Sequence, residues 1–403
     1  MRICLISNLY PPVSRGGAER VAQRIAQELH ARGHRVSIVS TMPPTDPATR
    51  RPLLREASIE RVYRFAPHNL YYLLDDHRFP YPLRAVWHLV DLCSASSERC
   101  VEEVLRQEKP DIVLTHNLKG IGLRVPQAAR TLGIPWIHTV HDVQLSVPSG
   151  LLLHGHRDHL VSIAFRNLYG MAVRKAMGPP NAVISPSQFL ADFYRQQNFF
   201  RNVPVHILPN PAPSWDARSR RPVRFPGPLR LLMAGQLERH KGVNELIDAV
   251  RRLSIPFELH MAGEGTLVDF VRDLGREDRR IVYHGFVSME GLRRLFAIMD
   301  ATVVPSVCAE NSPTVIYESF QAGVPVIASK IGGVGELIRE GKNGLLVELG
   351  DVAVWTAAIE SFDGQKDMFW ARGPEITASV ESYSLPHYVD TLEEIIRGVL
   401  GRT

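Results

Sequence analysis

Residues 1–40, MRICLISNLYPPVSRGGAERVAQRIAQELHARGHRVSIVS, decide the fold class of this chain. Residues 3–7 form a short apolar run suited to a buried strand, and apolar side chains then recur at helical spacing over residues 18–29. Gly33 can end that helix, and residues 35–40 supply a second strand. Two parallel strands joined by a helix form a right-handed βαβ unit, so this stretch predicts a doubly wound α/β sheet.

The same alternation continues along the chain and restarts near residue 229. Further strands are expected at residues 112–115, 136–140, 182–185, 229–234, 257–262, 281–283, 301–304 and 325–328, and helices at 243–253 and 388–399. Prolines crowd residues 204–228 and predict a linker, because proline interrupts both helices and central strands. We therefore expect an N-terminal α/β domain over residues 1–207, a second one over 208–385 and a terminal helical segment over 386–403. Open sheets usually bind ligands at the C-terminal ends of their strands, so a cleft is expected between the domains.

The composition is that of an ordinary globular protein. Of the 403 residues, 45% are hydrophobic and 22% are charged, which excludes a disordered or collagen-like chain. A formal net charge of +5 suits an anionic substrate or membrane surface, but it is too diffuse to indicate nucleic-acid binding. The four cysteines include no CxxC pair, so neither a zinc ribbon nor a disulfide framework is expected. The sequence has no signal-peptide pattern and no run of about 18 apolar residues, and it predicts a cytoplasmic location.

Two stretches of the first domain are both basic and aromatic. Residues 61–90 contain Tyr63, Phe65, Tyr71, Tyr72, Phe79, Tyr81 and Trp87, and residues 151–175 combine Leu151, Leu152 and Leu153 with Arg157, Arg166, Arg174 and Lys175. Surface helices of this composition can lie on an anionic bilayer. Core burial produces the same amphipathic periodicity, so a peripheral membrane contact and an ordinary core both stay open.

The strongest sign of a chemical site is the segment VPSVCAENSPTVIYE at residues 304–318. Ser312 is a favourable N-cap and Pro313 suits the first helical position, so a helix is expected to begin there. The unpaired N–H groups and the dipole of that helix would attract a diphosphate. Glu310 before the helix and Glu318 inside it can accept hydrogen bonds from hydroxyls at both ends of a nucleotide-sugar. The alternative is an ordinary capped surface helix with solvated glutamates.

A second loop of the C-terminal half carries a weaker signal. Gly235 and Gln236 end the first strand of that half, and Lys241 opens the helix that follows. A lysine at a strand-to-helix loop can neutralise a phosphate as a point charge. A solvated lysine is the alternative explanation for this residue taken alone.

The N-terminal half has two similar loops. Gly16 and Gly17 follow the first strand and would let the backbone approach a ligand closely, although a glycine pair more often serves a turn. His141 and Asp142 follow a predicted strand, so they are expected at its C-terminal edge, facing the cleft. A structural hydrogen bond between these two side chains is the alternative.

These segments, taken in order, resemble the retaining glycosyltransferases of family 4, the E-x7-E group with the GT-B architecture. The matching stretches are Tyr10-Pro11-Pro12, Gly16-Gly17-Ala18-Glu19-Arg20, His141-Asp142, Ser185-Pro186-Ser187, Leu208-Pro209-Asn210, Gly235-Gln236-Leu237, Lys241-Gly242, 310–318, Gly323-Val324-Pro325-Val326 and Gly332-Gly333. Each piece is degenerate, but their shared order and spacing over nearly the whole chain make the match specific. The resemblance implies two Rossmann-like domains facing a cleft, with the C-terminal helix crossing back to the N-terminal domain. It also implies an enzyme that moves a sugar from a nucleoside diphosphate sugar to an acceptor hydroxyl.

The resemblance also implies roles for single residues. Lys241 would bind the donor diphosphate, Glu318 the ribose hydroxyls and Glu310 the donor sugar. His141 would line the sugar pocket and join Lys241 and Glu310 in the catalytic set. The remaining donor contacts would come from Gly16, Gly17, Gln236, Ser312, Pro313 and the backbone N–H groups of Thr314 and Val315. The leaving phosphate would take the acceptor's proton, and neither a metal ion nor a cofactor other than the donor substrate is implied.

Two departures from the family pattern affect these expectations. The family usually has an arginine where this chain has Gln236, and a neutral amide can donate a hydrogen bond without offsetting phosphate charge. Asn210 is followed by Pro211 in place of the usual glycine, which predicts a different hinge shape. The implied acceptor is a carbohydrate or lipid-linked carbohydrate, in polysaccharide, lipopolysaccharide or glycolipid synthesis. A nucleotide-sugar epimerase of the same architecture and a catalytically weak nucleotide-sugar-binding scaffold remain alternatives.

Overall fold

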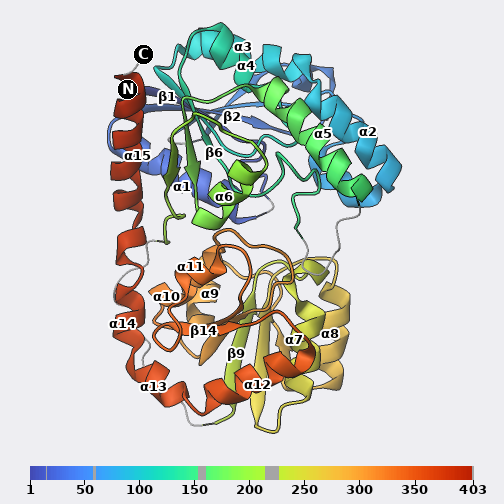
Figure 1. Ribbon diagram of the computed structural model, residues 1–403, viewed down its shortest axis with the longest axis vertical. Coiled ribbons are helices and arrows are strands. Elements are labelled where there is room, and N and C mark those ends of the chain that lie inside the picture. The colour runs from blue at the N-terminus through green and yellow to red at the C-terminus, as the bar shows by residue number, and fades with distance from the viewer. Residues whose placement is uncertain (15, 58–59, 153–159, 214–226, 402–403) are drawn as a thin grey trace. The chain divides into compact units, whose positions relative to one another are not determined.

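The chain divides into two compact units, each built around its own sheet (Figure 1). The computed structural model describes residues 1–14, 16–57, 60–152, 160–213 and 227–401. Among these residues, the first unit takes in 1–151, 160–209 and 385–401, and the second takes in 152, 210–213 and 227–384.

The first unit contains an eight-stranded sheet in the order β3-β4-β2-β1-β5-β6-β7-β8. The strands are β1 (Arg2–Ile6), β2 (Arg35–Thr41), β3 (Leu53–Ala57), β4 (Glu60–Phe65), β5 (Ile112–Thr115), β6 (Trp136–Thr139), β7 (Ala182–Ser185) and β8 (Val205–Ile207). All neighbouring pairs run parallel except β3 and β4, which pair antiparallel at one edge. β5, β6 and β7 are four-residue strands buried throughout, as expected for parallel strands covered on both faces. Their C-terminal ends therefore meet at one edge of the sheet.

Helices cover this sheet, and the last helix of the chain is one of them. They are α1 (Gly17–Ala31), α2 (Tyr81–Leu92), α3 (Ala95–Glu108), α4 (Pro126–Thr131), α5 (Leu160–Met177), α6 (Gln188–Gln196) and α15 (Leu385–Leu400), with short 3₁₀ turns at Pro47–Arg50 and Leu73–Arg78. α15 lies against α1 and shares a core cluster with β1 and β2 (Figure 1). A guanidinium nitrogen of Arg32 lies 2.6 Å from a carboxylate oxygen of Asp390, and His34 Nε2 lies 3.0 Å from Glu393 Oε1. Apolar packing and these polar contacts together fix α15 to the first unit.

The second unit contains a six-stranded sheet in which every neighbouring pair is parallel, in the order β11-β10-β9-β12-β13-β14. The strands are β9 (Leu229–Ala234), β10 (Phe257–Ala262), β11 (Ile281–Tyr283), β12 (Ala301–Val304), β13 (Val326–Ser329) and β14 (Gly344–Val347). The helices are α7 (Val243–Arg251), α8 (Val268–Glu277), α9 (Met289–Phe296), α10 (Thr314–Gln321), α11 (Val334–Leu337), α12 (Val352–Asp363), α13 (Lys366–Ala371) and α14 (Gly373–Ala378), with 3₁₀ turns at Arg239–Lys241 and Glu381–Tyr383. The strand order reverses between β9 and β12. The loops that follow these two strands therefore flank the switch point, where open α/β sheets bind ligands.

The predicted α/β class with two doubly wound sheets is confirmed by these two sheets. The sequence did not predict β3, β4, β8 or β14. These strands lie at or beside the sheet edges. No helix among the described residues is long and apolar enough to cross a bilayer.

The aromatic segment of the first unit divides between core and surface. Tyr63 and Phe65 lie in β4 and are buried, as are Tyr72 and Trp87, so the core interpretation is confirmed for these four residues. Tyr81, by contrast, is 83% exposed at the start of α2. Of the other residues named above, Leu153 and Arg157 lie outside the described residues.

Candidate active site

The structure brings Lys241 and Glu310 together in the second unit. Lys241 lies in the 3₁₀ turn Arg239–Lys241 after β9, and Glu310 lies in the loop between β12 and α10. Lys241 Nζ donates a hydrogen bond to Glu310 Oε1 at 2.5 Å, and the hydroxyl of Ser306 donates to the same oxygen at 2.7 Å. The loops on the two sides of the switch point are thus joined through a charged pair.

Backbone contact holds the Lys241 loop against the loop after β12. Gly242 has a φ of 74°, and a Cβ atom at this position would lie 1.9 Å from the carbonyl oxygen of Pro305. Only glycine permits both that φ and that approach. The N–H of Val307 donates to the carbonyl of His240 at 3.1 Å, which adds a direct link between the loops.

A second glycine loop supports Glu310 from the other side. Gly332 has a φ of 61°, and a Cβ atom there would lie 2.2 Å from the carbonyl oxygen of Glu310. The N–H of Gly333 donates to the same oxygen at 2.7 Å. The Gly332-Gly333 pair therefore fixes the backbone of Glu310, and its side chain is directed by Lys241 and Ser306.

Electrostatics keep both members of the pair charged. Burial alone would raise the pKa of Glu310, but attraction to Lys241 and hydrogen bonds from Lys241 and Ser306 outweigh it and lower that pKa. Burial would lower the pKa of Lys241, and the neighbouring Glu310 carboxylate raises it instead. At neutral pH the site therefore holds a fixed ammonium group beside the loop that leads into α10.

The helix at this site begins later than the sequence predicts. α10 starts at Thr314, and Pro313 occupies the N-cap position with no side-chain cap, so the assignments of Ser312 as N-cap and Pro313 as first helical residue are wrong. Pro313 has an extended conformation, with φ −63° and ψ 121°. The hydroxyl of Ser312 lies 2.7 Å from that of buried Tyr317, so it is engaged inside the unit and does not cap the helix.

The start of α10 still presents donor groups next to the charged pair. The first N–H groups of a helix, here those of Thr314 and Val315, lack acceptors within the helix. Asn210 orients this segment, because its side-chain amide donates to the carbonyl of Ser312 at 3.1 Å. Glu318 lies in the second turn of α10 with a largely buried side chain.

Gln236 lies in the loop after β9, five residues before Lys241, and is partly buried. The preceding residue, Gly235, is exposed and has a φ of 139°. The backbone around them is fixed by the N–H of Leu237, which donates to the carbonyl of Glu264 at 2.8 Å. Gln236 and Lys241 therefore belong to one loop of the second unit.

In the first unit, Gly16 and Gly17 form the beginning of α1. Gly16 is the N-cap, and its N–H donates to Glu19 Oε2 at 2.9 Å, which is the half of a capping box that glycine can form. Glu19 is 6% exposed, so the carboxylate that closes the helix start is buried. The absence of a Cβ atom on two successive residues leaves the backbone at this helix start unshielded by side chains.

His141 follows β6 and is paired with a second histidine. His116 follows the neighbouring strand β5, and its Nδ1 lies 2.8 Å from His141 Nε2. Burial lowers the pKa of His141 to about 4, and burial together with the nearby histidines lowers the pKa of His116. Both rings are therefore neutral at pH 7, which makes His141 a neutral hydrogen-bonding group there and not a cation.

A polar cluster surrounds the histidine pair. Asp142 Oδ1 accepts from the N–H of Gln144 at 2.8 Å, and burial raises the pKa of Asp142 to about 6. The amide of Gln144 donates in turn to Asn117 Oδ1 at 2.8 Å. These polar groups lie in the loops that follow β5 and β6, at the C-terminal edge of the first sheet.

The sequence prediction gave no role to four residues that contact the predicted ones or their segments: Ser306, Asn210 and Tyr317 in the second unit, and His116 in the first. Ser306 and His116 could have been found by one signal, since each lies just after the end of a predicted strand. Asn210 contacts Ser312, a residue far away in the chain, and local sequence patterns do not predict such a contact. Tyr317 contacts the Ser312 hydroxyl, which the sequence analysis had assigned to capping the helix. Among the described residues, no three His, Cys, Asp or Glu side chains converge in a way that could hold a metal ion.

Comparisons with known proteins show which family the chain resembles in sequence. Residues 228–362 match the model described as Glycosyl transferases group 1, and residues 16–211 match the model of the Glycosyl transferase 4-like domain. The glycogen synthase of Mycobacterium tuberculosis is 29% identical over 379 residues, which cover 90% of this chain and 86% of that protein.

Solved structures share the fold. Sucrose-phosphate synthase from Thermosynechococcus elongatus superposes with a TM-score of 0.76 at 18% identity over the full length of both chains. The Anabaena protein HepE, solved in complex with UDP, gives 0.69 at 16% identity over 99% of this chain and 100% of its own. The two family models together span most of the sequence, and the chain belongs to the family 4 glycosyltransferases with the GT-B fold, enzymes that transfer sugars from nucleotide-sugars.

Proposed function

We propose that this enzyme is a retaining, metal-independent glycosyltransferase that uses a nucleoside diphosphate sugar, with UDP-sugars as the first class to test. The observation that carries the proposal is the joining of Lys241, Glu310 and the start of α10 at one switch point. A fixed ammonium group and free helix N–H groups are the donors that a departing diphosphate needs. Structures of the HepE protein with UDP support the donor class.

In the proposed reaction, the bond between the anomeric carbon and the diphosphate oxygen breaks with its electron pair going to the diphosphate. The acceptor oxygen forms the new bond on the same face of the sugar, and the leaving phosphate takes its proton. Lys241 stabilises the negative charge that grows on the diphosphate, as do the N–H groups of Thr314 and Val315. This assignment needs neither a metal ion nor a carboxylate nucleophile of the enzyme.

The remaining site residues take positioning roles in this proposal. Glu310 and Glu318 accept hydrogen bonds from hydroxyls of the donor sugar and of the ribose. Ser312, Pro313 and Gln236 shape the phosphate end of the donor site. In the first unit, Gly16 and Gly17 let a ligand approach the backbone, and His141 contributes a neutral ring to the sugar pocket.

The proposed acceptor is a carbohydrate or a lipid-linked carbohydrate, in polysaccharide, lipopolysaccharide or glycolipid synthesis. A related protein of Klebsiella pneumoniae, 25% identical over 92% of this chain, is encoded in a cps region. Among the structural neighbours, WaaB is a lipopolysaccharide outer core galactosyltransferase and WaaG is involved in lipopolysaccharide biosynthesis. These relatives support a surface-glycan role.

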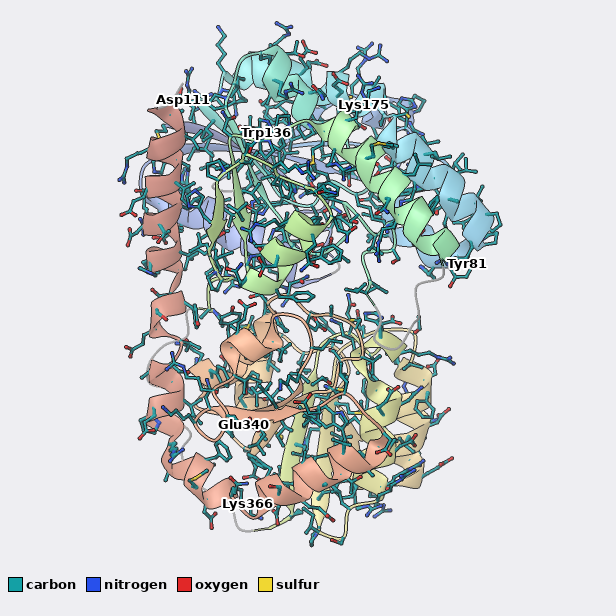
Figure 2. The ribbon with its side chains drawn as sticks, viewed as in Figure 1. Tyr81, Asp111, Trp136, Lys175, Glu340 and Lys366 are labelled. Atoms are coloured by element: carbon teal, nitrogen blue, oxygen red, sulfur yellow. The ribbon has the colours of Figure 1, made fainter. Side chains whose placement is uncertain are left out.

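A peripheral contact with the cytoplasmic face of an anionic membrane is proposed for one face of the first unit. The helices α2 and α5 lie side by side there, and Figure 2 labels Tyr81 and Lys175 at opposite ends of the pair (Figures 1 and 2). The exposed apolar side chains of this face, here called the α2–α5 face, are Tyr81, Val86, Leu89, Phe165, Leu168 and Met171. Apolar side chains exposed on two neighbouring helices of a globular unit are typical of an interaction site.

Charge favours an anionic lipid surface as the partner of the α2–α5 face. α5 carries no acidic residue, and its Lys175 is exposed, whereas its Arg174 lies over the ring of Phe199. α2 carries Arg84, and its one acid, Asp91, is buried with a pKa raised by burial to about 7. Apolar side chains interspersed with cations are the composition of interfacial helices.

The experiment that tests the proposed reaction is incubation of the enzyme with a panel of nucleotide-sugars and glycan acceptors. Release of nucleoside diphosphate with a new glycosidic bond is expected, and the anomeric configuration of the product should equal that of the donor. An inverted product would contradict the retaining assignment. Conversion of the donor to an isomer without nucleoside diphosphate release would favour an epimerase, and tight nucleotide binding without any transfer would favour a scaffold.

A further inference from the structure

The first unit contains a cavity away from the residues assigned to the reaction. It has a volume of about 520 Å³ and lies between α6, the strands β7 and β8, and the turn at residues 198–203. Val140, Val183 and Val205 contribute apolar lining, and Phe199 and Phe200 contribute aromatic lining. The walls are about evenly polar and apolar, and a volume in this range is typical of small-molecule sites.

Two arginines line this cavity, and among the described residues only one of them is paired with a carboxylate. Arg195 and Arg201 both line it. Arg195 is paired with Asp192 at 2.5 Å, whereas Arg201 donates to the side-chain oxygen of Asn198, a neutral group. In the part of the chain that the structure describes, Arg201 has no carboxylate within ion-pair distance.

A third guanidinium group, that of Arg174, is close enough to Arg201 for the positive charge of Arg201 to act on it. Burial, and then the positive charge of Arg201, lower the pKa of Arg174. Arg174 donates to the backbone carbonyl of Gln197 at 2.9 Å and lies over the ring of Phe199, so its contacts at this wall are also with uncharged groups. An anion beside Arg201 would relieve this repulsion.

The backbone of the turn adds further donors. Asn198, Phe200 and Asn202 all have φ between 57° and 61°, and for a bulky residue such as Phe200 this is a genuine outlier. Ring contacts to Tyr194 at 5.6 Å and His138 at 6.2 Å hold Phe200 in place. Within the described chain, the successive N–H groups of residues 200–202 have no backbone acceptor. The structure thus maintains a strained turn that carries unpaired donors beside a cavity.

We propose that this cavity binds a small molecule in which an anionic group, such as a phosphate, is attached to a planar apolar body. The anionic group would meet Arg195, Arg201 and the turn N–H groups, and the planar body would contact the valines and Phe200. Val140 lines the cavity and immediately precedes His141, so a bound molecule touches the chain segment that carries His141. The site does not depend on the proposed transfer reaction.

The probe for this site is 1-naphthyl phosphate, compared with 1-naphthol, which lacks the anionic group. Isothermal titration calorimetry on the full chain should show binding of the phosphate. The double variant Arg195→Gln/Arg201→Gln should weaken that binding at least about tenfold, since charge-assisted hydrogen bonds are lost. The control is Arg272→Gln/Arg276→Gln on α8, where each arginine is paired with an aspartate three residues before it, as Arg195 is with Asp192.

Two further measurements make the outcome decisive. Ala191→Phe, which places a ring in the cavity lining, should abolish binding of the phosphate probe, with the melting temperature reported to show that the variant folds. Hydrogen exchange with the probe bound should show protection at residues 188–205. The proposal is overturned if the control weakens binding as much as Arg195→Gln/Arg201→Gln does, if protection appears at residues 306–318 alone, or if no binding is detected. None of these readouts requires transferase activity, so the proposed reaction can fail without affecting them.

Discussion

The ammonium nitrogen of Lys241 lies 2.5 Å from Oε1 of Glu310, and the two residues are held there by separate glycine-dependent loops. The side chain of Lys241 is 27% exposed and that of Glu310 is 14% exposed, so the pair is largely shielded from water. A diphosphate arriving at the start of α10 would add a second anion to the same cation. Glu310 therefore positions Lys241, and it would compete with the diphosphate for the positive charge of that side chain.

Lys241→Ala should reduce turnover by a factor of about 10² or more, because it removes a fixed charge from the developing diphosphate. It should also destabilise the protein by about 1–3 kcal/mol, since Glu310 is left as a shielded, unpaired carboxylate. Denaturant unfolding and steady-state kinetics measure the two effects separately.

The matched control for that variant is the double substitution Lys241→Ala/Glu310→Ala. It should recover much of the lost stability without recovering activity, because the unpaired carboxylate is gone while the charge for the diphosphate is still missing. Wild-type turnover in Lys241→Ala would remove the charge-stabilisation argument. Additive stability losses in the double variant would mean that the pair is energetically uncoupled.

Glu318→Ala should weaken donor binding and leave the fold intact. The expected readout is loss of the thermal shift that nucleoside diphosphates give to the wild-type enzyme, because hydrogen bonds to the ribose would be missing. Glu340→Ala is a suitable control, since Glu340 is an exposed glutamate of the same unit. An unchanged nucleotide-induced shift in Glu318→Ala would separate Glu318 from the donor site.

Gly332→Ala tests whether the backbone of Glu310 must be held as the structure has it. A Cβ atom at residue 332 would lie 2.2 Å from the Glu310 carbonyl oxygen, so this variant should lose both activity and stability. Gly341 has a similar φ of 70°, but a Cβ atom at that residue would have no neighbouring atom within 4 Å. Gly341→Ala should therefore lose only about 1–2 kcal/mol of stability, through its left-handed conformation. Equal kinetics in the two variants would contradict the supporting role assigned to Gly332.

The sequence could predict the parts of this site that depend on local patterns. The βαβ alternation follows from the apolar spacing of residues 1–40, and the loops carrying Lys241 and Glu310 follow from the strands before them. The local sequence pattern predicts the wrong start for α10. Ser312 is a good N-cap residue by type, but in the folded chain its hydroxyl forms a hydrogen bond with the hydroxyl of Tyr317 instead. Similarly, His116 and His141 are 25 residues apart and meet only because β5 and β6 are neighbours.

The strands β3 and β4, at one end of the first sheet, are also not predictable from local sequence patterns. β3, LLREA, and β4, ERVYRF, mix apolar and charged residues without a clear period, so their sequences alone do not favour a strand. β4 forms by pairing with β2, and β3 then pairs antiparallel with β4. Their structure is therefore determined by the existing sheet edge, which is tertiary information.

The buried histidines predict a pH-dependent stability. Burial lowers the pKa of His141 to about 4 and that of His138 to about 3, both from 6.5. Between these values and 6.5 the unfolded chain binds more protons than the folded one, so the free energy of unfolding should fall as pH falls through that window. His138→Gln should flatten the slope between pH 6.5 and 4 relative to the wild type in urea unfolding. A control, His30→Gln at an exposed position, should leave the slope unchanged.

The α2–α5 face predicts binding to anionic vesicles. The wild-type enzyme should co-sediment with vesicles that contain phosphatidylglycerol and much less with pure phosphatidylcholine, and added salt should weaken the binding because cations of α2 and α5 contribute to it. The triple variant Leu89→Glu/Phe165→Glu/Leu168→Glu should lose most of this binding, since it removes three exposed apolar side chains and adds three negative charges.

The control for that variant changes exposed apolar residues elsewhere. Phe270 and Ile298 lie in the second unit, at 46% and 39% exposure, and Phe270→Glu/Ile298→Glu should leave vesicle binding unchanged. If both variants bind vesicles like the wild type, the α2–α5 face does not contact lipid. If the triple variant instead loses transfer to a soluble glycan acceptor while vesicle binding persists, the exposed side chains serve the acceptor directly. Measuring both activities on the same preparations distinguishes a lipid surface from a glycan as the partner of this face.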